Sequence, residues 1–148
     1  MSAQTNEEAY RRLMEEGFNR GNVAVVDELL SADFAEHENL PPGLPSGREG
    51  VKALIQAIHT AFPDLTHKLQ DITADRDKIW ARLTARGTNT GSLMGQPATG
   101  KQVTYDVIDI VRFAGGKIVE HWGVTDIWSM MQQLGAVRAP GQSAEARS

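Results

Sequence analysis

The chain has 148 residues, no cysteine and a formal net charge of −4, with 41% hydrophobic and 23% charged residues. This composition is typical of one globular domain, and it excludes disulfides, thiolate catalysis and metal sites built on sulfur. The acidic balance, without any run of Lys and Arg, also argues against nucleic acid as a partner.

The N-terminal sequence, MSAQTNEEAY, is polar and acidic and lacks the apolar stretch of a signal peptide. No run of about 18 apolar residues predicts a membrane span. With the absence of cysteine, these features favour a cytoplasmic protein that does not contact a membrane.

The first part of the chain predicts helices. Apolar residues recur at helical spacing over about 5–20, 22–30 and 46–62. Between the last two segments lies 38–47, ENLPPGLPSG, whose prolines and glycines require a loop. From residue 65 the period changes to two, which is typical of strands.

The predicted strands are 66–73, 77–87, 101–113 and 117–126, with a loop at 89–100, and a closing helix covers 127–134. Helices first, then a meander of about four strands, then one helix predict an α+β fold with an antiparallel sheet. A single domain over 1–135 is expected, followed by a small, polar, disordered tail at 136–148. A sheet that curves around the helices would enclose a hollow lined by alternate strand residues.

Two carboxylates are candidates for acid/base chemistry. Asp126 closes the last strand, and Asp109 interrupts the apolar run VIDIV. Alternation places Asp126 on the face of Trp122 and Asp109 on the face of Tyr105. If both faces line the hollow, burial raises the pKa of such an acid toward neutrality. Asp126 can equally be the N-cap of the closing helix, and Asp109 can be a buried partner of Arg82.

The histidines carry a weaker signal. His37 lies between two glutamates at the start of the Pro-rich loop, and His121 precedes Trp122. Both fit a surface histidine better than a catalytic one. No pair has metal-ligand spacing, and no nucleophile elbow, dinucleotide fingerprint or phosphate loop is present, so neither a metal site nor a cofactor is expected.

Several segments taken together, in this order and spacing, resemble the SnoaL-like polyketide cyclases, also called ester cyclases. They are DFAEHENLPPGLPSGREGVK (33–52), AFPDL (61–65), DRDKIWARLTARGTNTG (75–91), GQPATGK (95–101), VIDIVRF (107–113), GKIVEHWGVTD (116–126) and MMQQLG (130–135). The resemblance implies a cone-shaped α+β barrel of the nuclear-transport-factor-two kind around an apolar pocket. It also implies ring closure of a polyketide by intramolecular aldol condensation, without metal or cofactor.

By motif position the resemblance implies that Asp126 is the acid/base and that Asp109 assists it. His37 is a further candidate for returning a proton. The expected substrate-binding residues are Trp122, Tyr105, His121, Phe18 and Leu54, around a small apolar or aromatic polyketide-like ligand. Many relatives carry His at the position of Asn89; because Asn cannot titrate, no proton transfer is expected there.

Three alternatives remain open. An epoxide hydrolase or an isomerase could use the same fold; the former would need Asp109, Arg82 and Asp126 together, with Arg82 pointing inward. A noncatalytic small-molecule-binding domain needs the apolar hollow alone. The sheet face that carries Trp80 and Arg82 favours a homodimer.

Overall fold

The computed structural model describes residues 3–137 and 141. Its helices are α1 (Ala3–Arg12), the π-helical turn η1 (Leu13–Asn19), α2 (Ala24–Leu29), α3 (Gly47–Ala61) and α4 (Ile127–Leu134). Its strands are β1 (Leu30–Glu36), β2 (Thr66–Asp75), β3 (Lys78–Thr88), β4 (Gln102–Ala114) and β5 (Lys117–Thr125). No helix in this part of the chain is long and apolar enough to cross a bilayer. Most of the tail predicted to be disordered, 136–148, lies outside the described residues.

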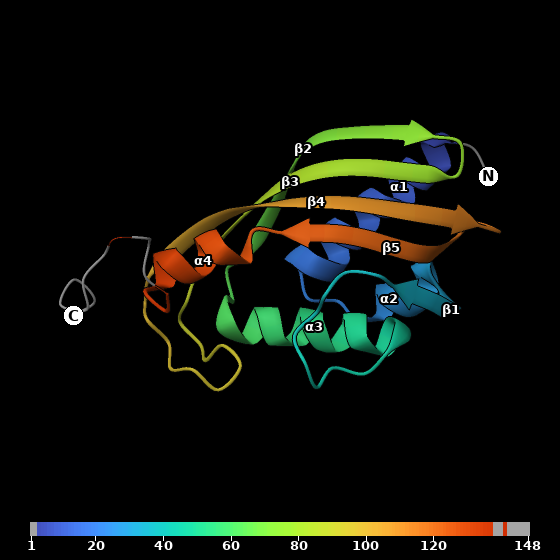
Figure 1. Cartoon of the computed structure of the whole chain (residues 1–148). Helices are drawn as coiled ribbons and strands as arrows, with labels where there is room; N and C mark the ends of the chain where they lie inside the picture. The colour runs from blue at the N-terminus through green and yellow to red at the C-terminus, as the bar shows by residue number, and fades with distance from the viewer. Residues whose placement is uncertain (1–2, 138–140, 142–148) are drawn as a thin grey trace.

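One curved sheet covers the helices, as Figure 1 shows, with α3 beneath it and α4 at the end where β5 stops. The strand order is β1-β5-β4-β3-β2, and β2 to β5 form the predicted antiparallel meander. Gly115 and Gly116 make the turn between β4 and β5 with φ values of +58° and +80°, which glycine adopts without steric cost. The predicted α+β class, with a curved sheet around N-terminal helices, is confirmed.

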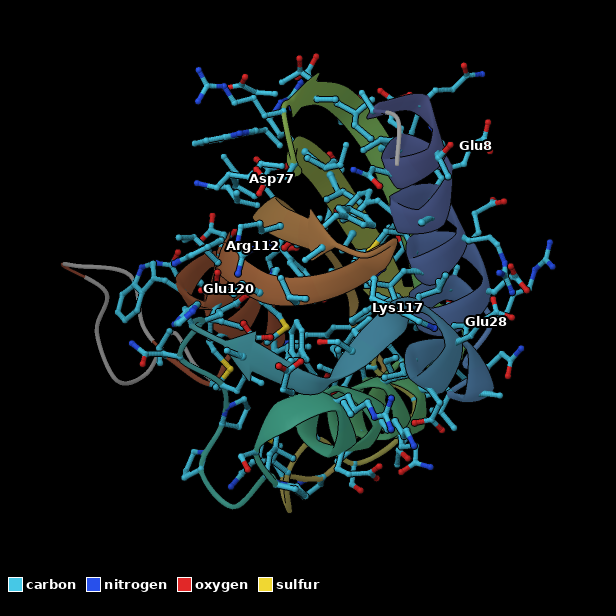
Figure 2. The ribbon with its side chains drawn as sticks, turned by 90° about the vertical axis from the view of Figure 1, so that its right-hand side faces the viewer. Glu8, Glu28, Asp77, Arg112, Lys117 and Glu120 are labelled. Carbon is cyan, nitrogen blue, oxygen red and sulfur yellow. The ribbon has the colours of Figure 1, made fainter. Side chains whose placement is uncertain are left out.

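Strand β1 was not predicted, because Leu30 was assigned to the helix over 22–30 and Phe34 only to the stretch that follows the end of that helix. The structure pairs β1 with β5 in parallel, with Glu36 opposite His121, so the sheet is mixed rather than purely antiparallel. This pairing joins residues far apart in the sequence, which local periodicity cannot reveal. Figure 2 shows Lys117 close to Glu28, whose carbonyl accepts a hydrogen bond from the Lys117 amine.

The core lies between the inner face of the sheet and the helices. Alternate residues of β3 and β4 are buried against residues of α1, α2 and α3, which confirms the period of two. The most deeply buried include Tyr10, Val26, Ile55, Phe62, Ile79, Leu83, Ala85 and Val103. Full burial of a large apolar side chain contributes roughly 1.5–3 kcal/mol, so this layer is the main source of stability.

The Pro-rich loop is held directly against α3. A Cβ atom added at Gly50, in the first turn of α3, would lie 2.1 Å from the carbonyl oxygen of Pro45. Contacts this short do not occur in folded proteins, so the loop backbone rests where a side chain would otherwise be. The position of the loop is therefore set by contact between two backbone segments.

Asn89 fastens the loop that follows β3. Its amide nitrogen donates to the carbonyls of Ala61 and Gly91 at 3.2 and 2.8 Å. Its oxygen accepts from the backbone N–H and the hydroxyl of Thr99, both at 2.9 Å. Asn89 is 1% exposed, so its side chain ties α3, the end of β3 and the loop together.

We expect Asn89→Ala to lower the free energy of unfolding by about 2–4 kcal/mol, because the substitution leaves buried backbone groups without partners. Urea unfolding followed by circular dichroism measures the change. Thr90→Ala, one residue away and exposed, serves as the control and should cost less than about 0.5 kcal/mol. Equal effects of the two substitutions would contradict the structural role of Asn89.

Candidate functional site

A cavity of about 100 Å³ lies between the inner face of the sheet and the helices. Its walls are mostly apolar and come from α1, η1, α3, strands β1, β2, β4 and β5, and the start of the Pro-rich loop. The predicted binding residues Phe18, Leu54, Tyr105 and His121 are among them. The full lining is Tyr10, Leu13, Met14, Phe18, Leu30, Phe34, Glu36, Glu38, Leu40, Val51, Leu54, Ile58, His67, Tyr105, Val107, Asp109, Val111, Ile118, His121 and Thr125.

A larger surface groove of about 810 Å³ runs along β1 and the Pro-rich loop. Four residues, Phe34, Glu36, Glu38 and Leu40, line both the groove and the cavity. The two hollows therefore adjoin where β1 passes into the loop, and the acidic end of the cavity is the end nearest the groove.

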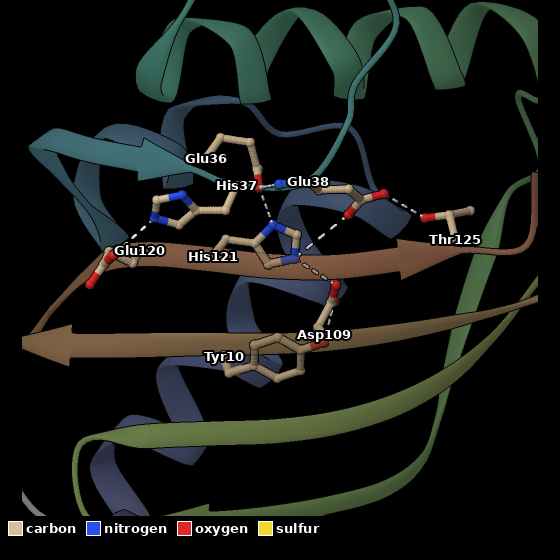
Figure 3. A network of polar contacts seen from close by, with 8 residues as sticks. All are labelled: Tyr10, Glu36, His37, Glu38, Asp109, Glu120, His121 and Thr125. Carbon is tan, nitrogen blue, oxygen red and sulfur yellow. Dashed lines mark hydrogen bonds and ion pairs between the residues drawn. The ribbon is translucent and has the colours of Figure 1, made fainter.

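A chain of short polar contacts occupies that end (Figure 3). Tyr10 donates its hydroxyl to Asp109 Oδ2 at 2.7 Å, and His121 Nε2 donates to Asp109 Oδ1 at 2.7 Å. His121 Nδ1 donates to Glu36 Oε1 at 2.5 Å. Because both ring nitrogens face carboxylates, both carry protons, and His121 is an imidazolium.

Opposing effects set the charge of His121. Burial alone would lower the pKa of the ring, but the hydrogen bonds to Asp109 and Glu36 and the charges of these carboxylates raise the pKa to about 10. The ring therefore stays charged at neutral pH, inside a mostly apolar wall.

Glu38 lies beside the histidine without a direct hydrogen bond to it. Its Oε1 is 3.9 Å from His121 Nε2, and its Oε2 accepts from the Thr125 hydroxyl at 3.0 Å. Burial raises the pKa of Glu38, although the charge of His121 acts in the opposite direction. A carboxyl group of this kind can accept or release a proton closer to neutrality than an exposed glutamate does.

One oxygen or nitrogen atom from each of Glu38, Asp109 and His121 lies within 4.8 Å of the others, a spacing at which a metal ion could be held. The histidine does not favour this use in its present state. Metal binding requires a neutral imidazole, whereas His121 is charged and already donates from Nε2.

Asp126 does not lie in the cavity, and the prediction that it is buried is wrong. Its side chain is exposed and accepts a hydrogen bond from the Ser129 backbone N–H at 3.1 Å, as the N-cap of α4. The helix-cap alternative is therefore confirmed. The residues in this part of β5 that face the core are His121, Gly123 and Thr125. Val124 and Asp126 alternate with them and therefore point to the outer face of the sheet.

His37 and Trp122 also lie outside the cavity. Their rings stack with centroids 5.0 Å apart, and His37 Nε2 donates to Glu120 Oε2 at 2.9 Å. Alternation along β1 and β5 turns these side chains to the outer face of the sheet. The prediction that Trp122 lines the pocket is wrong, and His37 cannot reach a ligand in the cavity from this position.

Arg82 lies on the outer face as well. Its Nε and Nη2 donate to Asp71 Oδ2, each at 2.7 Å. The arrangement required for an epoxide hydrolase, with Arg82 between Asp109 and Asp126, is therefore absent from the structure.

Three members of the network, Tyr10, Glu36 and Glu38, were missed. Tyr10 was assigned to an apolar helix stripe, and its hydroxyl gave no sign of a partner 99 residues away. The sequence Glu36-His37-Glu38 did contain a signal, because alternation in a strand puts both glutamates on the face opposite His37. Recognising that signal required knowledge of β1.

We predict that the His121 ion pairs make stability fall as pH rises. A folded pKa of about 10 against an ordinary value of 6.5 gives a contribution that is complete below pH 6.5 and lost toward pH 10. The loss should be on the order of 4 kcal/mol. The midpoints of urea unfolding at pH 6.5 and pH 10 measure this loss. His121→Gln should lack this dependence of stability on pH. The same dependence in the variant and in the parent protein would contradict the charged state of His121.

Comparison with known proteins agrees with this architecture. A family model described as SnoaL-like polyketide cyclase matches residues 8–134. The chain is 32% identical over 132 residues to aklanonic acid methyl ester cyclase DauD of Streptomyces sp. (strain C5), covering 84% of this chain and 78% of that protein. It is 25% identical over 124 residues to nogalonic acid methyl ester cyclase of Streptomyces nogalater, covering 82% and 92% respectively.

Among solved structures, TsrD from Streptomyces laurentii superposes with a TM-score of 0.82 at 26% identity, covering 93% of this chain and 99% of that one. The fold is that of the nuclear-transport-factor-two-like proteins, as the resemblance implied. From the model that matches residues 8–134 and from the relative at 32% identity, the chain belongs to the SnoaL-like polyketide cyclase family.

Proposed function

We propose that this protein is a cofactor-independent cyclase that closes a ring of a polyketide-type ester by intramolecular aldol addition. The observation that carries the proposal is the carboxylate–imidazolium pair of Asp109 and His121 on the wall of an otherwise apolar cavity. The family relationship supports the reaction class, since the named relatives are ester cyclases.

Ring closure needs a carbanion next to a carbonyl group. A C–H bond between two carbonyls is already acidic, so the Asp109 carboxylate is a sufficient base. Each of its oxygens accepts one hydrogen bond in the network and keeps a second acceptor site free. The enolate then attacks a second carbonyl of the same chain, and the new C–C bond leaves an alkoxide.

The imidazolium of His121 supplies the proton for that alkoxide. The proton taken up by Asp109 then moves to His121 across their 2.7 Å hydrogen bond, which restores both groups. No proton is gained or lost over the cycle, as an intramolecular aldol addition requires. Glu38 is a second proton carrier, because its raised pKa and its position beside His121 suit exchange with the groove.

The two hollows suggest how a large substrate binds. A volume of about 100 Å³ is small beside ordinary ligand pockets of roughly 300–1,000 Å³, so the cavity accommodates only the part of the chain that reacts. The remainder would lie in the adjoining groove under the Pro-rich loop. Apolar walls that hold the reacting carbons in contact reduce the entropic part of the barrier.

A matched pair of substitutions tests the assignment of the acid/base. With aklanonic or nogalonic acid methyl ester as substrate, Asp109→Asn should lower kcat by roughly 10²–10⁴-fold. Asp126→Asn should leave kcat within about twofold, because Asp126 is exposed and Asn also caps helices. Turnover is followed by the absorbance change of the substrate, and folding by the thermal midpoint.

The reverse result, with activity lost in Asp126→Asn and kept in Asp109→Asn, would overturn this assignment in favour of the one implied by motif position. Turnover of neither ester by the parent protein, with tight binding of both, would favour a noncatalytic small-molecule-binding domain. That second candidate has support in the structure, because both oxygens of Asp109 already have partners.

We also propose that the outer face of the sheet forms a homodimer. Trp80, Ile108 and Val124 are 44, 49 and 71% exposed on three adjacent strands, a larger apolar surface than isolated residues make. Beside this surface, Arg82 and Asp71 neutralise each other in an ion pair.

Val124→Glu should convert the dimer to a monomer in sedimentation equilibrium, because it places a charge in the apolar surface that the dimer would bury. Met94→Glu is the control, since Met94 is similarly exposed but lies in the loop after β3. A parent protein that sediments as a monomer would refute the dimer.

A further inference from the structure

A second polar group lines the cavity away from the catalytic pair. His67, near the start of β2, pairs with the fully buried Ala85 of β3 and therefore faces inward. Its ring lies edge-on to Phe18, with centroids 5.7 Å apart, and both residues line the cavity. His67 pairs with Ala85, which pairs in turn with Tyr105 of β4, and Asp109 lies four residues further along β4. The two polar groups are therefore separated both across the sheet and along its strands.

Asn19 fixes the tautomer of this histidine. The Asn19 amide nitrogen donates to the His67 carbonyl at 3.1 Å, and the amide oxygen accepts from the His67 backbone N–H at 2.6 Å. The orientation of the amide is thereby determined. The same oxygen lies 3.2 Å from His67 Nδ1, so Nδ1 must carry the proton and donate.

The opposite nitrogen of the ring is left as an acceptor. Burial lowers the pKa of His67 to about 4, although the charge of Asp109 acts against this, so the ring is neutral at pH 7. With the proton on Nδ1, Nε2 carries a lone pair, and within the described residues it has no hydrogen-bond partner. A neutral acceptor in an apolar wall selects for a hydrogen-bond donor.

We propose that His67 Nε2 is a specificity site that accepts a hydrogen bond from a hydroxyl group on an aromatic or enolised ring of the ligand. A ketone or carboxylate at the same place would set two acceptors against each other and would be rejected. This inference names the substrate class of the proposed cyclase, and it rests on that function only in placing the substrate in this cavity.

The test compares 4-methylphenol with 4-methylanisole, which differ only in replacing the donor O–H by O–CH₃. In NMR titrations of the full chain, we expect the phenol to bind roughly 3- to 10-fold more tightly than the ether. The ¹⁵N resonance of His67 Nε2 should lie in the range of an unprotonated nitrogen and should shift with the phenol but not with the ether. This second readout needs no variant.

Three variants test whether the preference for the phenol over the ether depends on His67. His67→Phe keeps an aromatic ring without an acceptor and should bind both probes equally, whereas His67→Gln keeps an acceptor and should retain part of the preference. Asp126→Asn, which lies outside the cavity, should retain all of it. No preference in the parent protein, or its survival in His67→Phe, would overturn the proposal.

Binding is measured without turnover, so the inference can fail separately from the proposed function. Loss of cyclase activity in Asp109→Asn, together with a phenol preference in the parent protein that disappears in His67→Phe, would support both. An intact cyclase without a phenol preference would remove the His67 site alone.

Discussion

The buried imidazolium of His121, held between the carboxylates of Asp109 and Glu36, is the interaction on which the rest of this structure depends. A charge in an apolar wall is unfavourable unless close, oriented partners compensate for lost hydration. These partners come from β4 and β1, the two strands on either side of β5, which carries His121. The parallel pairing of β1 with β5 brings Glu36 opposite His121. The compensation of the buried charge therefore depends on this strand pairing.

The same pairing of a buried cation with carboxylates also provides groups that can exchange protons. A carboxylate and a cationic acid lie in contact at fixed geometry, with Tyr10 of α1 holding the second carboxylate oxygen from the helical side. Preorganised groups of this kind need little rearrangement during proton transfer. The walls of the cavity are mostly apolar and carry polar groups at two places, the acidic network and His67. In the proposed function, the acidic network is the reactive end of the cavity and His67 is its recognition end.

Sequence periodicity was sufficient for the helices, the four-strand meander and the inward parity of Asp109 and Tyr105. It failed for β1, whose pairing partner lies about 85 residues away in β5, and so it failed for Glu36. It also failed for Asp126: the residue could equally cap α4 or face the hollow, and motif position favoured the second. Sequence periodicity could not show which face of β5 points toward the core. That depends on the register with β4, where a bulge between Arg112 and Phe113 shifts the pairing.

The contact between Gly50 and the carbonyl of Pro45 has a consequence for the shape of the surface groove. Pro45 belongs to the Pro-rich loop that lines this groove, whereas Gly50 lines neither the groove nor the cavity. Any side chain at position 50 would have to displace the backbone of Pro45. A substitution in α3 that touches neither hollow would therefore alter the wall of one of them.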